Sequence, residues 1–287
     1  MTEFMHSPSG SYPPSASIAP GGQQVNAAAQ PAAAVQPIIS ARSLSKTYGF
    51  NPVLHQVSLD IFPGQSVAIM GPSGSGKTTL LHILSGIIQP DAGSVFLRNA
   101  QGYRDIAAMS NAERTALRAS HFGFVFQQGL LVPELTASEN IALSAMLAGM
   151  SRSQARTRAQ QLLQQLGLGA LGNRRIGELS GGQAQRVAIA RAQVNDAPII
   201  FADEPTGALD SATAREVMQV LLNVTTSNTA LVIVTHDPAV AQACQRVIHV
   251  RDGVIVSDSA QQTQQAPQNT IQQTPQAPAQ HQQNWGA

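Results

Sequence analysis

The sequence lacks the long apolar segments of a membrane-spanning chain. No run of eighteen consecutive apolar residues occurs among its 287 residues, so we expect no helix that crosses a bilayer. The N-terminus has no basic stretch followed by an apolar one, which argues against a secretory signal. Cys244 is the single cysteine and cannot form an internal disulfide. These absences together predict a cytoplasmic protein.

Charge is also scarce. Charged residues make up 11% of the chain, and the formal net charge is +1. All 17 Lys and Arg residues lie between positions 39 and 257, together with every acidic residue except Glu3 and Asp258. That central part is therefore only mildly basic, too weakly for a nucleic-acid-binding surface, and we expect no nucleic-acid partner.

Two terminal segments, 1–38 and 258–287, show no apolar periodicity. The first consists mainly of Ala, Pro, Gly, Ser and Gln, and the second is rich in Gln with Pro and Thr. Neither segment can bury enough apolar surface to offset its loss of conformational entropy, so we expect both to be disordered. Residues 39–257 are then the folded domain.

A glycine-rich octapeptide, 71–78, follows a short strand predicted at 65–70 and precedes a helix predicted from Lys77. Glycines let its backbone bend and bring N–H groups close to phosphate oxygens, and the helix N-terminus faces the anion. The pattern predicts a nucleoside triphosphate site in which Lys77 reaches the β- and γ-phosphates and Thr78 ligates Mg²⁺. The predicted nucleotide-binding residues here are Gly71, Pro72, Ser73, Gly74, Ser75, Gly76, Lys77, Thr78 and Thr79.

A second apolar strand, predicted at 198–202, ends in the acidic pair Asp203 and Glu204. Ligands of open α/β sheets gather at this carboxyl edge of the strands. We expect Asp203 to hold Mg²⁺ and Glu204 to orient or deprotonate the attacking water. The alternative is that both carboxylates only cap the next turn. The upstream Lys77 and Thr78 favour the catalytic interpretation, because they supply the phosphate and Mg²⁺ contacts that it needs.

The pentapeptide from Leu179 to Gln183 lies between these two motifs. A Ser and two glycines at the start of a helix form a second phosphate-binding surface, for which one chain with one triphosphate has no obvious use. Two chains packed head to tail would use both surfaces. The ordered trio of motifs resembles the ABC-type ATPases, the motor subunits of ATP-driven membrane transporters. The resemblance implies a homodimer around two ATP molecules, each contacted by the other copy through Ser180, Gly181, Gly182 and Gln183.

Four further positions match the ABC family one by one. Tyr48 stands upstream of the phosphate loop, where the family carries an aromatic ring that stacks on adenine. Gln127 resembles the glutamine that touches Mg²⁺ and signals to the membrane partner, although Gln128 beside it leaves the assignment open by one position. His236 matches the histidine that contacts the γ-phosphate, and Asp210 the loop that crosses to the partner subunit. The catalytic residues that the resemblance implies are Glu204, His236 and Gln127, and the metal ligands are Thr78, Gln127 and Asp203.

The resemblance covers residues 39–256 and implies an α/β fold. Its P-loop NTPase core is a mixed sheet with an antiparallel β subdomain, and a helical subdomain is inserted at about 128–180. Capping-box patterns begin helices at Ser110 and Thr136, and apolar residues recur at helical spacing from Ala155 to Leu166. The apolar stretch 130–135 has two interpretations, packing inside this subdomain or a groove for a coupling helix of the membrane partner.

Several phrases narrow the resemblance to the macrolide-export and lipoprotein-release branch of ABC ATPases, namely residues 124–128, 135–140, 185–192 and 203–207. The branch implies a subunit that binds ATP and Mg²⁺ and hydrolyses ATP to power a separate permease, an integral membrane protein. Its work would be export, or mechanical work on lipoprotein, drug or peptide-like substrates. The subunit would be peripheral on the inner face of the cell membrane through that permease.

Three other functions of ABC ATPases compare with that of a transporter motor as follows. A DNA-repair ABC protein would need long coiled-coil arms, and no extended heptads occur. A translation factor of the family would carry two cassettes, and one is present. A regulatory motor of the same branch, as in cell division, would signal through its permease without moving a substrate, and the sequence leaves that alternative open.

Overall fold

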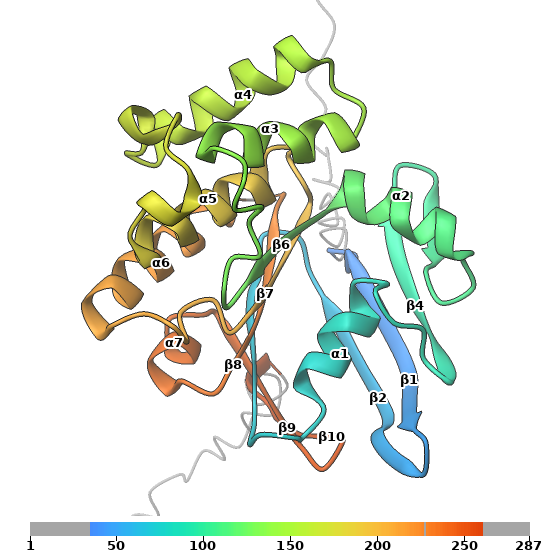
Figure 1. The fold of residues 1–287 in the computed structure, drawn as a ribbon. Coiled ribbons are helices and arrows are strands. Elements are labelled where there is room, and N and C mark those ends of the chain that lie inside the picture. Colours follow the sequence, from blue (N-terminus) through green and yellow to red (C-terminus); the bar gives the residue numbers. More distant parts are fainter. Residues whose placement is uncertain (1–34, 227, 261–287) are drawn as a thin grey trace, which may run out of the picture. The chain divides into compact units, whose positions relative to one another are not determined.

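Two β-sheets carry the part of the chain that the computed structural model describes, residues 35–226 and 228–260 (Figure 1). The smaller sheet has the strand order β2-β1-β4-β5 with antiparallel neighbours. The larger has the order β10-β9-β3-β8-β7-β6, and its strands are parallel except β10, which is antiparallel to β9. The predicted mixed sheet with an antiparallel subdomain is confirmed. The strands are β1 (Ile39–Tyr48), β2 (Asn51–Ile61), β3 (Ser66–Met70), β4 (Ala92–Asn99), β5 (Gly102–Asp105), β6 (Phe122–Phe126), β7 (Ile199–Asp203), β8 (Ala230–Thr235), β9 (Arg246–Arg251) and β10 (Val254–Asp258).

The central strands of the larger sheet are mainly apolar because other elements cover both of their faces. Every residue of β8 is buried, and in β3 and β7 only the last residue is partly exposed. Continuous apolar runs of this kind are typical of parallel strands between two helical layers. The partly exposed last residues mark the carboxyl edge of the sheet.

The helices divide between two hydrophobic clusters on opposite faces of the larger sheet. Val232 and Ile233 are neighbours on β8 and enter different clusters, because successive strand side chains point to opposite faces. The Val232 cluster contains α1 and the smaller sheet, and the Ile233 cluster contains α5, α6 and α7. The helices are α1 (Lys77–Leu84), α2 (Asn111–His121), α3 (Ala137–Leu147), α4 (Arg152–Gln165), α5 (Gly181–Gln193), α6 (Ser211–Asn223) and α7 (Pro238–Gln242), with short 3₁₀ turns at Gly169–Leu171 and Ile176–Glu178.

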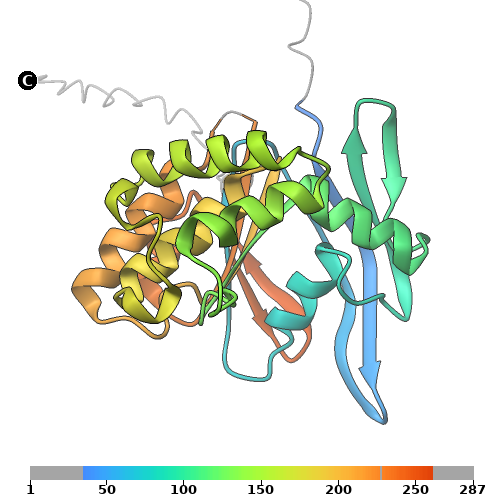
Figure 2. The same cartoon turned by 45° about the horizontal axis from the view of Figure 1, so that its top comes forward.

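A third cluster joins α3, α4 and the outer side of α5 into a helical lobe (Figure 2). Thr136 begins α3 with the capping box that the sequence predicts, and the apolar residues predicted to recur in α4 are buried. Ser110 also forms its predicted capping box, but the helix it begins, α2, precedes β6 and contacts that strand. The lobe therefore starts after β6, and α2 lies outside it.

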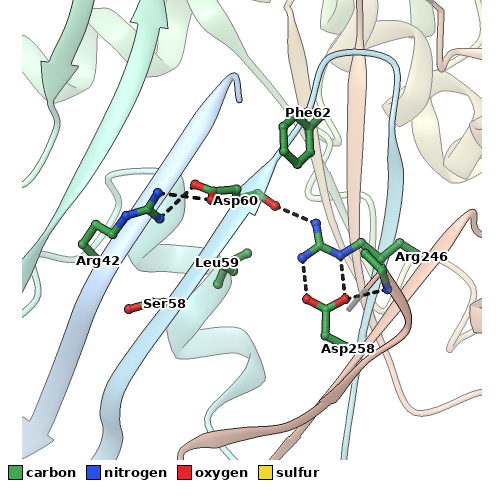
Figure 3. A pocket seen from close by; sticks show the side chains of 8 residues that line it. Arg42, Ser58, Leu59, Asp60, Phe62, Arg246 and Asp258 are labelled. Atoms are coloured by element: carbon green, nitrogen blue, oxygen red, sulfur yellow. Dashed lines mark hydrogen bonds and ion pairs between the residues drawn. The ribbon is translucent and has the colours of Figure 1, made fainter. Parts of the chain in front are cut away.

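A buried ion pair fastens the last strand to the rest of the fold (Figure 3). The Arg246 guanidinium donates to Asp258 at 2.8 and 2.5 Å and to the carbonyl of Asp60 at 2.7 Å. The side chains of Arg246 and Asp258 are 7% and 3% exposed. The sequence analysis placed Asp258 at the start of the C-terminal tail, whereas β10 includes it. A charged residue at a tail boundary gives no local sign of a partner twelve residues away.

The N-terminal boundary of the folded domain also differs from the predicted start at residue 39. Ile38 is buried and its N–H donates to the carbonyl of Ile61, so Ile38 packs with the fold. The predictions of disorder for residues 1–34 and 261–287 lie outside the described residues. Within the described ranges, no helix has the length and apolarity needed to cross a membrane.

Candidate functional site

The loop between β3 and α1 has a backbone that only glycine allows at two positions. Gly71 has φ of 154°, and a Cβ built there would lie 2.0 Å from the carbonyl oxygen of Val250. Gly76 has φ of 98° and is the N-cap of α1, with no side chain accepting a hydrogen bond from the first turn. The N–H groups at the start of α1 are thus available to an anion.

Two polar groups of the segment 71–78 are buried with few compensating contacts among the described residues. Lys77 is 8% exposed, and its ammonium donates to the carbonyl of Pro72 at 2.8 Å while forming no ion pair with any described residue. Ser75 Oγ is buried and has no hydrogen-bond partner among the described residues. A buried cation and an unpartnered hydroxyl in one loop fit an anionic ligand. Pro72, Ser73 and Gly74 form the exposed rim, and Thr79 lies in the first turn of α1.

Asp203 meets the phosphate loop at the end of β7. Thr78 Oγ1 donates to Asp203 Oδ1 at 3.3 Å. Burial raises the pKa of Asp203, against the opposing effects of the His82 charge and the Thr78 hydrogen bond. The described residues contain no group of three or more His, Cys, Asp or Glu that could hold a metal alone. A hydroxyl beside one carboxylate fits Mg²⁺, which uses few protein ligands and takes the rest from phosphates and water.

Glu204 is held in a costly conformation beside His236. Its φ is 47°, a region that non-glycine residues rarely adopt, and its N–H donates to the carbonyl of Val234 at 2.9 Å. One carboxylate oxygen lies 2.8 Å from Nδ1 of His236, and the other accepts from the Thr235 hydroxyl at 3.4 Å. Because β7 and β8 are neighbours, their carboxyl ends bring this acid and this histidine together.

Gln127 follows β6 at the same edge of the sheet and is exposed. A Cβ built on Gly207 would lie 3.0 Å from Gln127 Nε2, so this side chain contacts the loop after Glu204. Gln185 and Arg191 of α5 hold the turn that carries Gln127. Gln185 donates to the carbonyl of Phe126, and Arg191 donates to those of Gly129 and Leu130.

Arg191 is a site residue that the sequence motifs do not single out. Burial lowers its pKa, and it forms no ion pair with the described carboxylates. Arg191 is the one charged residue within the apolar run 187–192. That interruption of an apolar run was the available signal, and it did not reveal which carbonyl groups the guanidinium would bind.

Tyr48 ends β1 at the tip of the hairpin with β2, and the residue is 46% exposed. Tyr48 pairs with Asn51, and two residues further along β2 the carbonyl oxygen of Val53 lies 2.8 Å from a Cβ built on Gly76. The hairpin that carries Tyr48 therefore touches the phosphate loop through Val53.

Ser180, Gly181, Gly182, Gln183 and Asp210 form a second group. Ser180 caps α5 in a capping box with Gln183, and Asp210 caps α6 through the N–H groups of Ala212 and Thr213. A Cβ on Gly182 would lie 2.4 Å from Thr213 Cγ2, so the two helix starts touch. Since α5 and α6 pack on the opposite face of the large sheet from α1, one chain keeps this group apart from Lys77.

Comparisons with known proteins agree with this geometry. A family model described as "ABC transporter" matches residues 54–207, just over half of the chain. Macrolide export ATP-binding/permease protein MacB of Chromobacterium violaceum is 46% identical over 78% of this chain and 34% of its own length. Pyoverdine export ATP-binding/permease protein PvdT of Pseudomonas aeruginosa is 46% identical over the same shares. The chain thus spans about a third of the length of these curated relatives.

The solved structures include a cassette that matches nearly end to end. The dimeric post-hydrolysis state of the ATP-binding cassette MJ0796, bound to ADP and Pi, superposes with a TM-score of 0.68 at 39% identity. The match covers 77% of this chain and 97% of that one. The shared part is therefore nearly the whole MJ0796 chain.

Proposed function

Because the chain belongs to the ABC transporter family and is an ATPase of that type, we propose that it is the motor that powers a membrane permease in export. In this proposal two copies of the domain close around two ATP·Mg²⁺ and reopen after hydrolysis. The observation that carries it is the loop 71–79, whose buried ammonium, unpartnered hydroxyl and uncapped helix start fit a triphosphate.

The residues around this loop divide the work of holding the nucleotide. Lys77 contacts the β- and γ-phosphates, and Thr78, Asp203 and Gln127 hold Mg²⁺, which neutralises charge on the phosphate oxygens. The raised pKa of Asp203 supports this role, because a nearby cation would offset the burial of its carboxylate.

Glu204 is the group that orients or deprotonates the attacking water. Its strained backbone aims the carboxylate at the edge where the phosphate loop ends, and His236 and Thr235 fix both oxygens. His236 contacts the γ-phosphate. Catalysis by this pair rests on positioning and electrostatics, as in phosphoryl transfer generally.

Ser180, Gly181, Gly182 and Gln183 bind the nucleotide of a second copy, with Asp210 beside them. Within one chain the starts of α5 and α6 lie across the sheet from Lys77, so they reach a triphosphate only through a partner. The MJ0796 cassette, which matches over nearly its whole length, is dimeric. Each site is then completed by both copies, and ATP occupancy drives closure.

The permease docks on the lobe near Gln127, on the inner face of the cell membrane. Exposed apolar side chains gather on α3 and on the loop before it, at Leu130, Val132, Leu143, Met146 and Leu147. The relatives that match over a third of their length are ATP-binding/permease proteins for macrolide or pyoverdine export. These names support export as the function, and drug-like, peptide-like or lipoprotein molecules are the cargo that we propose.

Replacement of Glu204 by Gln tests the proposal. The amide keeps the size of the side chain and removes the base, so ATP binding should persist while turnover falls at least a hundredfold. Size-exclusion chromatography with ATP should show a stable dimer, since hydrolysis no longer reopens it. Glu216→Gln, at an exposed surface ion pair, is the matched control and should hydrolyse ATP at the parent rate. Unchanged turnover in Glu204→Gln would remove Glu204 from catalysis.

A further inference from the structure

A lysine side chain lies over the ring of Tyr48. Lys46 Nζ is 5.6 Å from the ring centroid, within the range of a cation–π contact. The same ammonium forms an ion pair with Asp91 Oδ1 at 2.7 Å. The Lys46 side chain is only 16% exposed, although its length would let it extend into solvent. The ammonium is thus fixed between a carboxylate and an aromatic face.

Asp91 is itself fastened to the strand that carries Tyr48. Its second oxygen accepts from the N–H of Thr47 at 2.7 Å, and its own N–H donates to the carbonyl of Ser45 at 2.9 Å. The hydrogen bonds from Lys46 and from the N–H of Thr47 lower the pKa of Asp91, so the carboxylate remains charged at neutral pH. The carboxylate therefore anchors Lys46 at a fixed place on β1.

The ring that Lys46 covers is well placed for a nucleobase. Val53 on β2 touches the phosphate loop at Gly76, and Asn51, the pairing partner of Tyr48, is two residues away. Two strand residues span about 7 Å, which is the scale of a ribose between a phosphate and its base. Lys46 occupies one face of the ring, and because Tyr48 as a whole is 46% exposed, we take the other face as the one on which a base stacks.

We propose that Lys46, anchored by Asp91, is a positioning residue that holds the Tyr48 ring ready for the adenine of ATP. The inference rests on the proposed ATP site and adds a residue pair to it. A ring at a hairpin tip would otherwise sample several rotamers and lose that freedom when the base binds. The Lys46 ammonium over one face restricts the rotamers of the Tyr48 ring before the base binds. It leaves the phosphate chemistry at Lys77 and Glu204 unchanged.

Lys46→Met tests this role because methionine keeps an unbranched side chain of similar length and removes the charge. We expect the KM for ATP to rise about two- to fivefold, the worth of an exposed cation–π contact, while kcat stays at the parent value. Lys46→Arg keeps a cation over the ring and should restore the parent KM. Asp91→Asn should raise KM in the same direction. Arg104→Met, which removes a surface cation from another ion pair of the same sheet, is the control and should change neither constant.

A double-mutant cycle with Tyr48→Ala separates positioning from a general effect on the hairpin. If Lys46 acts through the ring, Lys46→Met should raise KM in the parent and have no effect in the Tyr48→Ala background. Equal effects in both backgrounds, or a parent KM in Lys46→Met, would overturn the inference. If Tyr48→Ala itself leaves the KM for ATP unchanged, the adenine contact within the proposed function fails, which is a distinct result.

Discussion

At the scale of single residues, the site is marked by groups whose conformation or burial is costly. Gly71 cannot carry a side chain because the carbonyl of Val250 occupies the space, and Glu204 has φ of 47°. Lys77 is a buried cation without an ionic partner among the described residues. Such costs persist only where the surrounding structure imposes them, and they cluster at functional sites. All three residues lie at or beside the phosphate loop and the carboxyl ends of β3 and β7.

The Arg246–Asp258 pair places two charged side chains in the interior, where each depends on the other for compensation. Asp258→Asn leaves the guanidinium buried without its counter-charge, so we expect the free energy of unfolding to fall by about 3 kcal/mol. Urea denaturation at neutral pH measures this change. Asp196→Asn removes the acid of an exposed pair with Arg158 and should cost less than about 1 kcal/mol. Equal losses in both variants would contradict the assigned role of the buried pair.

The Arg246–Asp258 pair also makes the free energy of unfolding depend on pH in the acid range. Burial alone would raise the pKa of Asp258, but the hydrogen bonds and charge of Arg246 outweigh it and hold that pKa below its ordinary 3.8. The stabilisation is therefore complete above about pH 4 and is lost as the pH falls through the lowered pKa of the folded state. Asp258→Asn should show a smaller loss of stability on acidification than the parent.

At the scale of elements, helix starts were predictable and the surroundings of each helix were not. The capping boxes at Ser110 and Thr136 depend on residues three apart, so the sequence displays them directly. Whether a helix joins the lobe or the sheet depends on distant apolar partners. The stretch 130–135 shows this, because Leu131 packs in the lobe cluster while Leu130 beside it is 60% exposed. Packing inside the lobe thus holds for Leu131, and the exposure of Leu130 leaves that residue available to the proposed docking surface.

The burial of Leu131 and the exposure of Leu130 predict different effects when each residue is replaced by Asp. Leu130→Asp should leave the melting temperature and the ATPase activity of the isolated chain intact and weaken the hold on the permease. Leu131→Asp should lower the melting temperature, because it places a charge in the lobe cluster. Affinity capture from solubilised membranes measures how much permease each variant binds. Mass spectrometry then identifies the captured permease as a protein with several membrane-spanning segments. Equal recovery of that protein with parent and Leu130→Asp would exclude Leu130 from the docking surface.

At the scale of the whole molecule, the described fold contains the phosphate loop, the acidic pair Asp203 and Glu204, and the helical lobe. We predict that a chain reduced to residues 35–260 keeps the ATPase activity and melting temperature of the full sequence. The removed segments contain no apolar periodicity and no metal or phosphate motif. Differential scanning fluorimetry and a phosphate-release assay test this. A loss of several degrees would mean that a terminal segment packs on the domain.

A second truncation defines the boundary more sharply. Ending the chain at position 257 removes Asp258 and also Ser259, whose hydroxyl accepts from the N–H of Val247. That chain should melt well below the one that ends at 260, and similar melting temperatures would place the boundary where the sequence analysis put it.

The sequence by itself determined the fold class and the chemistry-bearing motifs, because both depend on short-range patterns. The phosphate loop needs glycines at fixed spacing, and the acidic pair needs an apolar strand before it. Only the tertiary structure decided how these pieces meet. It brought Glu204 to His236 through neighbouring strands, placed Lys46 over Tyr48 by way of Asp91, and put the start of α5 across the sheet from Lys77. These contacts join residues far apart in the chain, and their partners are selected by sheet order and packing, which no local pattern encodes.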